Sequence, residues 1–348
     1  MKAIKKSIIT KSVENFKINR KIRTAYLPKS GDVAVFQVLS IGKHSAIQAE
    51  NGNNAYIFPG DKILATFGNR YATAQFEGYV PTKHHSKYHI LGQGGVVGVL
   101  ASMHAKFDDI GPTEVKLVGY AVDANNKVIN TQYNGIEQLQ FNPNKERDYE
   151  LYLSVGASMG SGKTTTAAFL CRGFMQQKRK VAFIKLTGTV FAKDCSIVRD
   201  CGARTAIDFS YCGYPSTYLC ETDEVLNILE TLLNRVERIK PDVVVIEIAD
   251  GLLQRETKAL INHKPFMNMI NGTLLSCADS LSVNSGIDIL TKVNQTPLLI
   301  SGIFTTSPLM VAEVKKETNI PVFTLEDFTN KMSFGCIFPN IKELINAE

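Results

Sequence analysis

The chain has 348 residues, of which 44% are hydrophobic and 21% charged, as in an ordinary globular protein with room for two separate cores. No apolar run reaches the roughly 20 residues of a membrane-spanning helix, and no apolar signal segment follows the basic start, so we expect a cytoplasmic protein without a membrane partner. The net charge is +6, and the seven cysteines include no C-x-x-C pair, which argues against a disulfide framework.

The positive charge is concentrated in residues 1–30, where Glu14 is the one acid. The basic residues there are Lys2, Lys5, Lys6, Lys11, Lys17, Arg20, Lys21, Arg23 and Lys29. Such a segment suits nucleic-acid phosphates, but few aromatic side chains are interleaved. We therefore favour a solvated basic arm and keep a nucleic-acid partner as the alternative.

Residues 31–141 predict a β-rich domain, either a small barrel or a sandwich. Apolar and polar residues alternate in stretches such as DVAVFQVLS, and glycine or proline-glycine turns recur roughly every 8–12 residues. The glycine-rich run LGQGGVVG suits either the start of a close-packed helix or a ligand-contacting loop. The polar stretch NPNKERD, residues 142–148, predicts a linker to a second domain over residues 149–348.

The second domain begins with the stretch LYLSVGASMGSGKTTTAAFL, which predicts a strand, a phosphate-binding loop and a helix. Gly160 and Gly162 allow backbone amides to approach a polyphosphate, Lys163 reaches its terminal phosphates, and the Thr164 hydroxyl is suited to bind a phosphate-bound Mg²⁺. Ala157 is the one departure from the pattern G-x-x-x-x-G-K-[ST]. The expected nucleotide contacts are Ala157, Ser158, Met159, Gly160, Ser161, Gly162, Lys163, Thr164 and Thr165.

After this loop, strands and helices alternate as in a doubly wound, mostly parallel α/β sheet. The strand VAFIK ends at Lys185 and is followed by Thr187 and Thr189, at the edge where such sheets bind ligands. We expect these side chains to lie at the reaction site.

Acids follow this strand at Asp194, Asp200 and Asp208. Carboxylates near a phosphate loop hold Mg²⁺ or orient a nucleophile, because the metal is shared between phosphate oxygens and hard protein oxygens. Each of these acids alone is also explained as an exposed loop residue.

The stretch PDVVVIEIADG predicts a strand buried on both faces that ends in two carboxylates, Glu247 and Asp250. A charged Glu247 in so apolar a run is costly unless it has a metal or a cation as partner. We therefore expect this strand to bind Mg²⁺ or to orient water beside the phosphate loop.

The order of ASMGSGKTT, KLTGT, an acidic loop and VVVIEIADG resembles the dethiobiotin synthetase-like (SIMIBI) branch of the P-loop NTPases, over about residues 149–328. The chain also resembles a two-domain group of P-loop proteins with an added N-terminal domain. The resemblance implies that Lys185 holds substrate and phosphate, that Asp194 or Asp200 binds metal, and that Glu247 completes the magnesium site. The β-rich domain and the loop DFSYCGYPSTY depart from the dethiobiotin synthetase pattern.

We predict an enzyme that uses ATP and Mg²⁺ for phosphoryl transfer to, or ligation of, a small carboxylate-bearing molecule. ATP is favoured because the chain has no N-K-x-D guanine signature. One alternative is a nucleotide-driven switch or nucleic-acid-associated ATPase, another is a transferase that uses a different phosphate-containing cofactor, and a homodimer stays open. The expected catalytic residues are Lys163, Lys185 and Glu247, the metal ligands Thr164, Asp194 and Glu247, and the substrate contacts Thr187, Thr189, Asp208 and Asp250.

Overall fold

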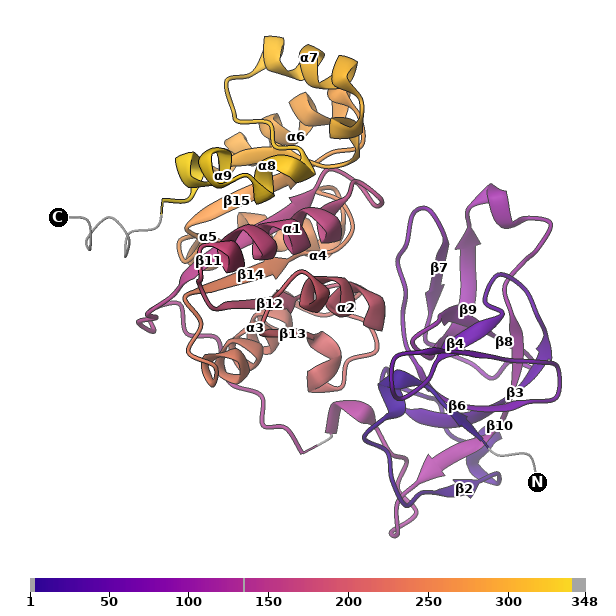
Figure 1. The fold of residues 1–348 in the computed structure, drawn as a ribbon. Helices are drawn as coiled ribbons and strands as arrows, with labels where there is room; N and C mark the ends of the chain where they lie inside the picture. Colours follow the sequence, from indigo (N-terminus) through magenta and orange to yellow (C-terminus); the bar gives the residue numbers. More distant parts are fainter. Residues whose placement is uncertain (1–3, 134, 340–348) are drawn as a thin grey trace. The chain divides into compact units, whose positions relative to one another are not determined.

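The computed structural model describes residues 4–133 and 135–339, and the chain forms two compact units (Figure 1). Unit 1 comprises Met1–Leu139, Thr187–Lys193 and Asp208–Cys220, and unit 2 comprises Gln140–Leu186, Asp194–Ile207 and Glu221–Glu348. The expected fold class is confirmed, since unit 1 is β-rich and unit 2 holds a mostly parallel sheet with helices. Lys2 of the basic segment and residues 340–348 of the expected second domain lie outside the described residues.

Unit 1 is built from short strands and 3-10 helices. They are β1 (Lys5–Lys6), η1 (Ile8–Thr10), β2 (Lys17–Asn19), η2 (Ile22–Thr24), β3 (Val33–Ser40), β4 (Ala46–Gln48), β5 (Asn54–Tyr56), β6 (Lys62–Phe67), β7 (Phe76–Tyr79), β8 (Tyr88–Gly92), β9 (Val96–Met103), η3 (Ala105–Phe107), β10 (Glu114–Val122), η4 (Thr131–Tyr133) and η5 (Phe209–Cys212). Five strands close into a ring in the order β6-β3-β10-β8-β9, because β9 pairs back onto β6. A closed ring leaves none of these five strands as an edge, so unit 1 is a small barrel.

Aromatic side chains fill the inside of this barrel. Phe36, Phe67, Tyr88 and Tyr120 are buried, and the rings of Phe36 and Phe67 meet edge to face with centroids 5.1 Å apart. The Phe67 ring also contacts Tyr88 at 5.5 Å. Each such pair contributes about 0.5–1.5 kcal/mol beyond the burial of its area.

The basic segment is not a separate arm, in contrast to the prediction from its charge. β1 pairs with β6 and β2 pairs with β10, and Val13 between them is buried. Lys5 forms an ion pair with Asp61 at 2.7 Å. The apolar residues among the lysines therefore fold residues 4–19 onto the barrel.

Two segments that lie between elements of unit 2 in the sequence belong to unit 1. Thr189 pairs with Ser216 as an isolated bridge, and the Val190 amide donates to the Pro215 carbonyl at 3.1 Å. Gly94 packs against the first segment, because a Cβ there would lie 2.3 Å from the Val190 carbonyl oxygen. The glycine-rich run after β8 is therefore a close-packed turn and not the start of a helix.

Unit 2 has a six-stranded sheet in the order β13-β12-β14-β11-β15-β16. Its elements are β11 (Glu150–Gly156), α1 (Lys163–Gln176), β12 (Val181–Lys185), α2 (Ala192–Asp200), β13 (Thr205–Asp208), α3 (Thr222–Glu237), β14 (Val243–Glu247), α4 (Arg255–Asn262), α5 (Lys264–Met267), β15 (Gly272–Ser276), α6 (Ser280–Lys292), β16 (Leu299–Ser301), η6 (Ile303–Thr306), α7 (Pro308–Glu317), α8 (Leu325–Thr329) and α9 (Lys331–Ile337). The pairs of β11, β12, β14, β15 and β16 are parallel. Val322 forms only an isolated parallel bridge to Ile300, and α8 follows it.

Helix α1 lies against one face of the sheet together with α8 and α9 (Figure 1). Phe174 of α1 packs edge to face on Phe334 and Phe338, with ring centroids 5.1 and 5.0 Å away. Gly173 leaves room for this contact, because a Cβ there would lie 2.3 Å from the Phe334 ring. The aromatic cluster fixes the helix that follows the phosphate loop.

Residues 142–148 are held on unit 2 and are not a free linker. Arg147 forms an ion pair with Glu230 of α3 at 2.7 Å, and the two side chains are only 5% and 4% exposed. Lys145 pairs with Glu237 of the same helix at 2.8 Å, and the Tyr149 hydroxyl donates to Glu237 at 3.0 Å. Lys145 and Arg147, whose charges contributed to the prediction of a linker, are therefore ion-pair partners of α3.

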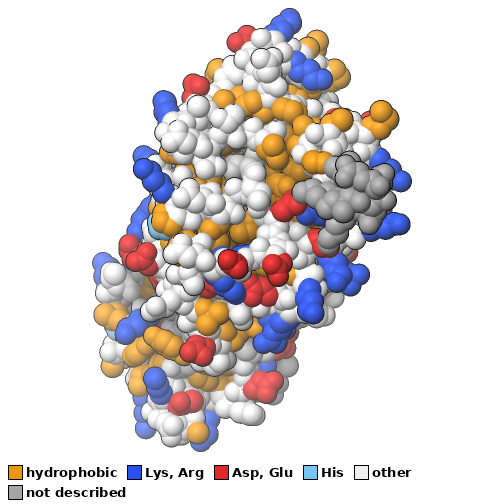
Figure 2. Space-filling model, turned by 90° about the vertical axis from the view of Figure 1, so that its left-hand side faces the viewer, with side chains coloured by type: hydrophobic (Ala, Val, Ile, Leu, Met, Phe, Trp, Pro, Cys, Tyr) orange, Lys and Arg blue, Asp and Glu red, His pale blue; other side chains and the backbone are white. Residues whose placement is uncertain are grey.

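Among residues 4–133 and 135–339, no helix combines the length and the apolar character needed to cross a bilayer. On the face shown in Figure 2, Lys and Arg side chains are interspersed with Asp and Glu. The positive net charge therefore forms no single-sign field on that face.

Candidate functional site

Polar side chains gather at the carboxyl ends of the parallel strands of unit 2. Glu247 at the end of β14 pairs in register with Lys185 of β12 on one side and Ser154 of β11 on the other. Paired residues of parallel strands point to the same face, so these three side chains form a row on the face that α1 covers. Ser276 of β15 and Ser301 of β16 are paired in the same way further along the edge.

The phosphate loop connects β11 to α1 over residues 157–162. Gly160 and Gly162 have φ angles of 78° and 96°, a left-handed conformation that side chains disfavour. In the described part of the chain, no backbone carbonyl accepts a hydrogen bond of normal geometry from the amides of residues 158–162. These amides and the N-terminus of α1 are the groups that bind phosphate in such loops.

Lys163, the first residue of α1, is 7% exposed, and its Nζ donates to the Ser158 carbonyl at 3.0 Å. The lysine thus folds back over the loop. Burial lowers the pKa of Lys163, while the nearby carboxylates of Glu247 and Asp250 raise it in part. A bound phosphate group would add the negative charge that favours the ammonium form.

Glu247 is almost completely buried, with 1% exposure, and its Oε1 accepts a hydrogen bond from the Thr164 hydroxyl at 3.1 Å. Within the described chain, its Oε2 is a buried acceptor without a hydrogen-bond partner. Burial raises the pKa of Glu247, and Lys185 and Lys163 offset this in part. A buried carboxylate oxygen without a hydrogen-bond partner is costly.

Lys185 lies beside this carboxylate and forms an ion pair with Asp194 of α2. Both ends of this pair are largely buried, at 8% and 21% side-chain exposure. Asp194 also raises the pKa of Glu247, so it lies within electrostatic reach of it. Asp200, the other candidate, is an exposed residue at the end of α2.

The loops after β14 and β16 pack closely on the phosphate loop. Gly251 has no room for a side chain, because a Cβ there would lie 2.6 Å from the Ala157 carbonyl oxygen. Gly302, with φ of 115°, is as crowded, since its Cβ would lie 2.5 Å from the Ser161 carbonyl oxygen. The Ile303 amide donates to that same Ser161 oxygen at 3.1 Å.

The sequence-based prediction missed Ser154, Ser276 and Ser301 as parts of this site. A signal for the serines is present, because each follows an apolar run in its strand, as LYLS, TLLS and LLIS. Ser276 bonds to Thr166 of α1 at 3.1 Å, which ties β15 to the helix.

The predicted substrate residues do not all fall in one unit. Asp250 is in unit 2, in a left-handed conformation with φ of 63°, whereas Thr187, Thr189 and Asp208 belong to unit 1. Asp208 caps η5 by accepting from the Ser210 amide at 2.9 Å. Their shared role in substrate binding stays a prediction.

The residues of this edge fit a magnesium ion that arrives with a nucleotide. Thr164 and Glu247 place two oxygen donors side by side, one of them unsatisfied, and Mg²⁺ typically takes one or two protein oxygens together with phosphate oxygens and water. Residues 4–133 and 135–339 hold no cluster of three His, Cys, Asp or Glu side chains arranged for a metal.

No protein-family model and no curated protein matches the chain. Solved structures similar to it include the signal recognition particle 54 kDa protein from Aeropyrum pernix K1 in complex with GDP, with 18% identity, TM-score 0.36, and coverage of 55% of this chain and 45% of that chain. A second is the signal recognition particle receptor FtsY from Elizabethkingia anophelis in complex with GDP, with 17% identity, TM-score 0.38, and coverage of 62% of this chain and 76% of that chain. A third is the hydrogenase maturation factor HypB from Archaeoglobus fulgidus, with 15% identity, TM-score 0.35, and coverage of 55% of this chain and 88% of that chain. The present chain covers less than half of the length of the signal recognition particle protein. The assignment of the fold rests on the molecule's own strand order and phosphate loop, by which unit 2 has the P-loop NTPase fold.

Proposed function

We propose that unit 2 binds a nucleoside triphosphate with Mg²⁺ at the phosphate loop and transfers its terminal phosphoryl group to a small, carboxylate-bearing molecule, or uses it to ligate that molecule. The observation that carries the proposal is the buried Glu247 carboxylate, which bonds to Thr164 and keeps one oxygen unsatisfied next to the loop. Such an oxygen is poorly explained by folding alone, because an unsatisfied buried acceptor costs about 1–3 kcal/mol.

Each residue of the site has a proposed task. The loop amides and Lys163 hold the β- and γ-phosphates, and Thr164 and Glu247 provide oxygens for Mg²⁺. The ion, when bound, neutralises charge on the phosphate oxygens. Asp194, the remaining predicted ligand, is proposed to hold Lys185 in position, since the two form an ion pair.

Lys185 is proposed to stabilise negative charge that develops during transfer. It pairs in register with Glu247, so its ammonium group lies at the strand end where the reaction is expected. Phosphoryl transfer depends mainly on positioning and charge stabilisation, so this set of residues needs no covalent nucleophile.

ATP is the proposed nucleotide, because the sequence has no N-K-x-D guanine signature. The basic start of the chain gives less support to a nucleic-acid partner, since Lys5 and Lys6 are engaged in ion pairs with Asp61 and Glu50. A small-molecule acceptor is therefore preferred.

The test is to measure release of the nucleoside diphosphate from ATP and from GTP, with and without Mg²⁺, for the wild type and for Lys163→Ala. We expect Mg²⁺-dependent turnover of ATP that the variant loses by at least about a hundredfold. Bound nucleotide should also stabilise the wild type by about 2.7 kcal/mol at a hundredfold excess over Kd.

Equal turnover in Lys163→Ala would contradict the proposal, as would a wild type that ATP fails to stabilise. Stabilisation by another phosphate-containing cofactor, without stabilisation by ATP, would instead assign the loop to that cofactor. A preference for GTP would overturn the choice of base and leave the phosphate site in place.

A further inference from the structure

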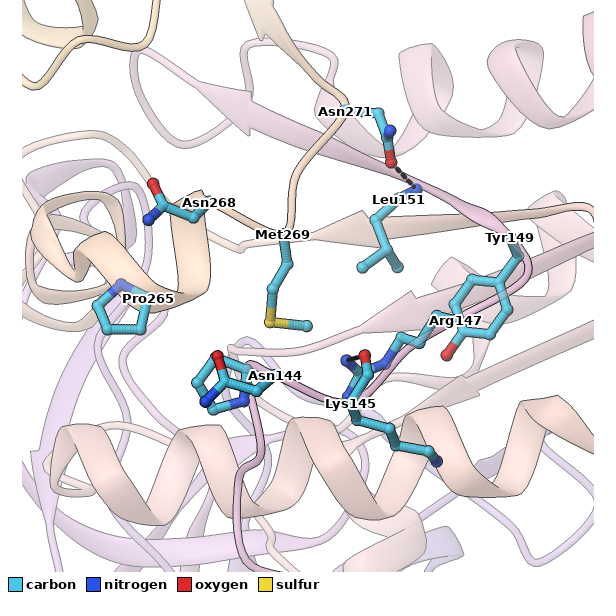
Figure 3. Close-up of a pocket in the computed structure, with 10 residues that line it drawn as sticks. Asn144, Lys145, Arg147, Tyr149, Leu151, Pro265, Asn268, Met269 and Asn271 are labelled. Atoms are coloured by element: carbon cyan, nitrogen blue, oxygen red, sulfur yellow. Dashed lines mark hydrogen bonds between the residues drawn. The ribbon is translucent and has the colours of Figure 1, made fainter.

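Lys43 of unit 1 is a partly buried lysine that forms no ion pair with a carboxylate in the described part of the chain. Two cations of unit 2 show the usual arrangement. Lys145 and Arg147, at the cavity drawn in Figure 3, pair with Glu237 at 2.8 Å and with Glu230 at 2.7 Å. Removing a cation from water is costly unless negative charge compensates it, so the position of Lys43 calls for an explanation.

The Lys43 amine lies between two aromatic rings and a neutral carboxamide. Its Nζ is 5.2 Å from the ring centroid of Phe76 and 4.9 Å from that of Phe107. Gln75 Oε1 accepts hydrogen bonds from Lys43 Nζ and from Arg70 Nη2, the latter at 2.7 Å. Two cationic side chains thus converge on one oxygen, and the carboxamide that carries it adds no negative charge.

A third cation, Lys106, lies over the same ring as Lys43, with its Nζ 5.2 Å from the Phe107 centroid. Lys106 is exposed, and its ammonium group makes no hydrogen bond or ion pair with the described residues. Asp108 and Asp109 follow in the sequence, but both are exposed, and neither pairs with the two lysines in the chain as described. The surroundings of Lys43 are therefore positively charged.

These surroundings favour the neutral form of the Lys43 amine. Burial, together with Arg70 and Lys106, lowers the pKa of Lys43 to about 7. The neighbouring His44 adds no positive charge, because burial, Lys43 and Arg70 lower its pKa to about 3. A neutral amine in an apolar pocket or beside another cation is a nucleophile.

The sign of the surrounding charge selects among the reactions of such an amine. Condensation with an aldehyde gives an imine whose protonated form is a cation, and Arg70 and Lys106 would repel it as they repel the ammonium group. Addition to carbon dioxide gives a carbamate, which is an anion that the same two cations attract. Carbon dioxide is also small and uncharged, so neither the phenyl rings nor the cations oppose its approach.

We propose that Lys43 binds carbon dioxide covalently, as a carbamate. The neutral amine nitrogen attacks the carbon of CO₂ and forms an N–C bond, one C–O π pair moves onto oxygen, and one amine proton passes to solvent. The remaining N–H stays on Gln75 Oε1. The carbamate oxygens accept from Lys106 and from Gln75 Nε2, which makes no hydrogen bond within the described chain, and Arg70 contributes charge. The inference is independent of the chemistry at the phosphate loop.

The test traps the carbamate on the full chain. The protein is equilibrated in mildly alkaline buffer with isotope-labelled carbon dioxide, carbamates are ethylated with a trialkyloxonium salt, and the modified peptides are identified by mass spectrometry. We expect labelled product on Lys43 that rises saturably with CO₂. The exposed Lys127 of the same unit is the internal control. Its occupancy should be at least about tenfold lower, because an ordinary lysine is almost wholly protonated at that pH.

Substitutions at the exposed Lys106 test the role of the surrounding charge. Lys106→Gln should weaken CO₂ binding at Lys43 by about threefold or more, since it removes a cation that disfavours the ammonium form and attracts the carbamate. Lys106→Arg keeps the charge and should bind CO₂ like the wild type. At constant pH, CO₂ should also stabilise the wild type against unfolding more than it stabilises Lys43→Met.

The proposal is wrong if no labelled carbamate forms on Lys43 at saturating CO₂, or if Lys43 and Lys127 are modified alike. Unchanged CO₂ binding in Lys106→Gln would also contradict it. Stabilisation of the wild type by bicarbonate without a trapped carbamate would mean that an anion binds without a covalent bond. The comparison of Lys43 with Lys127 is made on wild-type molecules without nucleotide, so it needs neither a folded variant nor activity of unit 2.

Discussion

The Thr164 hydroxyl donates to Glu247 Oε1 at 3.1 Å, although 83 positions separate the two residues in the sequence. The contact joins the first turn of α1 to the end of β14, and it leaves Glu247 Oε2 without a partner in the described chain. The phosphate-loop helix α1 and the strand β14 thus meet at this hydrogen bond.

The substitution Glu247→Gln tests the proposed charge at this point. It keeps the shape of the side chain but removes the carboxylate, so Mg²⁺-dependent turnover should fall by about a hundredfold or more. The free energy of unfolding without nucleotide should stay level or increase, because a buried charge is removed. Glu317→Gln on the exposed end of α7 is the control, and turnover is followed as a function of Mg²⁺ concentration. Full activity in Glu247→Gln would count against the proposed metal site.

Thr164 can be tested by a pair of substitutions of similar size. Thr164→Ser keeps the hydroxyl that contacts Glu247 and should retain most of the Mg²⁺-dependent nucleotide affinity. Thr164→Val removes the hydroxyl and should lower that affinity by about tenfold, the equivalent of about 1.4 kcal/mol. Titration of the nucleotide at fixed Mg²⁺ measures both. If the two variants bind alike, the hydroxyl has no part in binding.

Gly302→Ala should weaken nucleotide binding without touching the nucleotide. A methyl group there would lie 2.4 Å from the Cys277 carbonyl oxygen and 2.5 Å from the Ser161 carbonyl oxygen, at a φ of 115°. The phosphate loop must shift to relieve this clash, and we expect a loss of at least about tenfold in affinity. Gly335→Ala is the control, since nothing lies within 4 Å of a Cβ at that position of α9. An unchanged Kd for Gly302→Ala would show that the loop tolerates the displacement.

The buried ion pair between Arg147 and Glu230 gives a prediction about stability. Arg147→Met leaves Glu230 with a much more distant cation, Lys145 at 3.9 Å, so the free energy of unfolding should fall by about 3 kcal/mol or more. Glu230→Met should cost a similar amount, and the double variant should lose less than the sum of the two. Urea unfolding followed by circular dichroism measures all three. Strict additivity would mean that the pair contributes no coupling.

Lys43 of unit 1 predicts a dependence of stability on pH. Burial, together with the nearby Arg70 and Lys106, lowers the pKa of Lys43 to about 7, below its ordinary value of 10.5. Between these values the unfolded chain holds the proton and the folded protein has released it, so stability rises with pH across about pH 7–10.5. The penalty for the charged amine is fully present below this window.

Lys43→Met should remove this dependence. The difference in unfolding free energy between wild type and variant should shift in favour of the wild type as the pH rises from 7 toward 10. Lys127→Met, at an exposed lysine of the same unit, is the control. A difference that stays flat with pH would mean that the Lys43 amine titrates near its ordinary value.

The strands and helices of unit 2 could be predicted because apolar runs, glycine turns and helical spacing are local signals. The phosphate loop and the buried β14 are examples, since each is defined by consecutive residues. It could not be predicted in this way that the loop after β12 belongs to unit 1. Val190 packs on Gly94, a contact between two segments nearly a hundred residues apart, and no local pattern in either segment predicts the other as its partner.

The charge of residues 142–148 misled in a similar way. Arg147 and Lys145 resemble the solvated residues of a linker, but their partners lie on the amphipathic helix α3. Glu237 is the last residue of that helix, and Glu230 lies about two turns before its end. Pairing between a charged loop and a helix requires the tertiary structure. The same limit applies to Lys185 and Asp194, which are nine positions apart and become partners only because α2 turns back toward the strand.

The assignment of Thr187–Lys193 and Asp208–Cys220 to unit 1 has a consequence for the gene. A fragment that stops at residue 139 would contain every strand of the barrel. It would lack the two later segments of unit 1, which include Val190 and Pro215. The two folded units therefore do not correspond to two stretches of coding sequence, and neither can be moved to another protein by a single cut. A recombinant version of unit 1 would have to be joined from three pieces, with one bridge in place of β11, α1 and β12 and a second in place of most of α2 and β13.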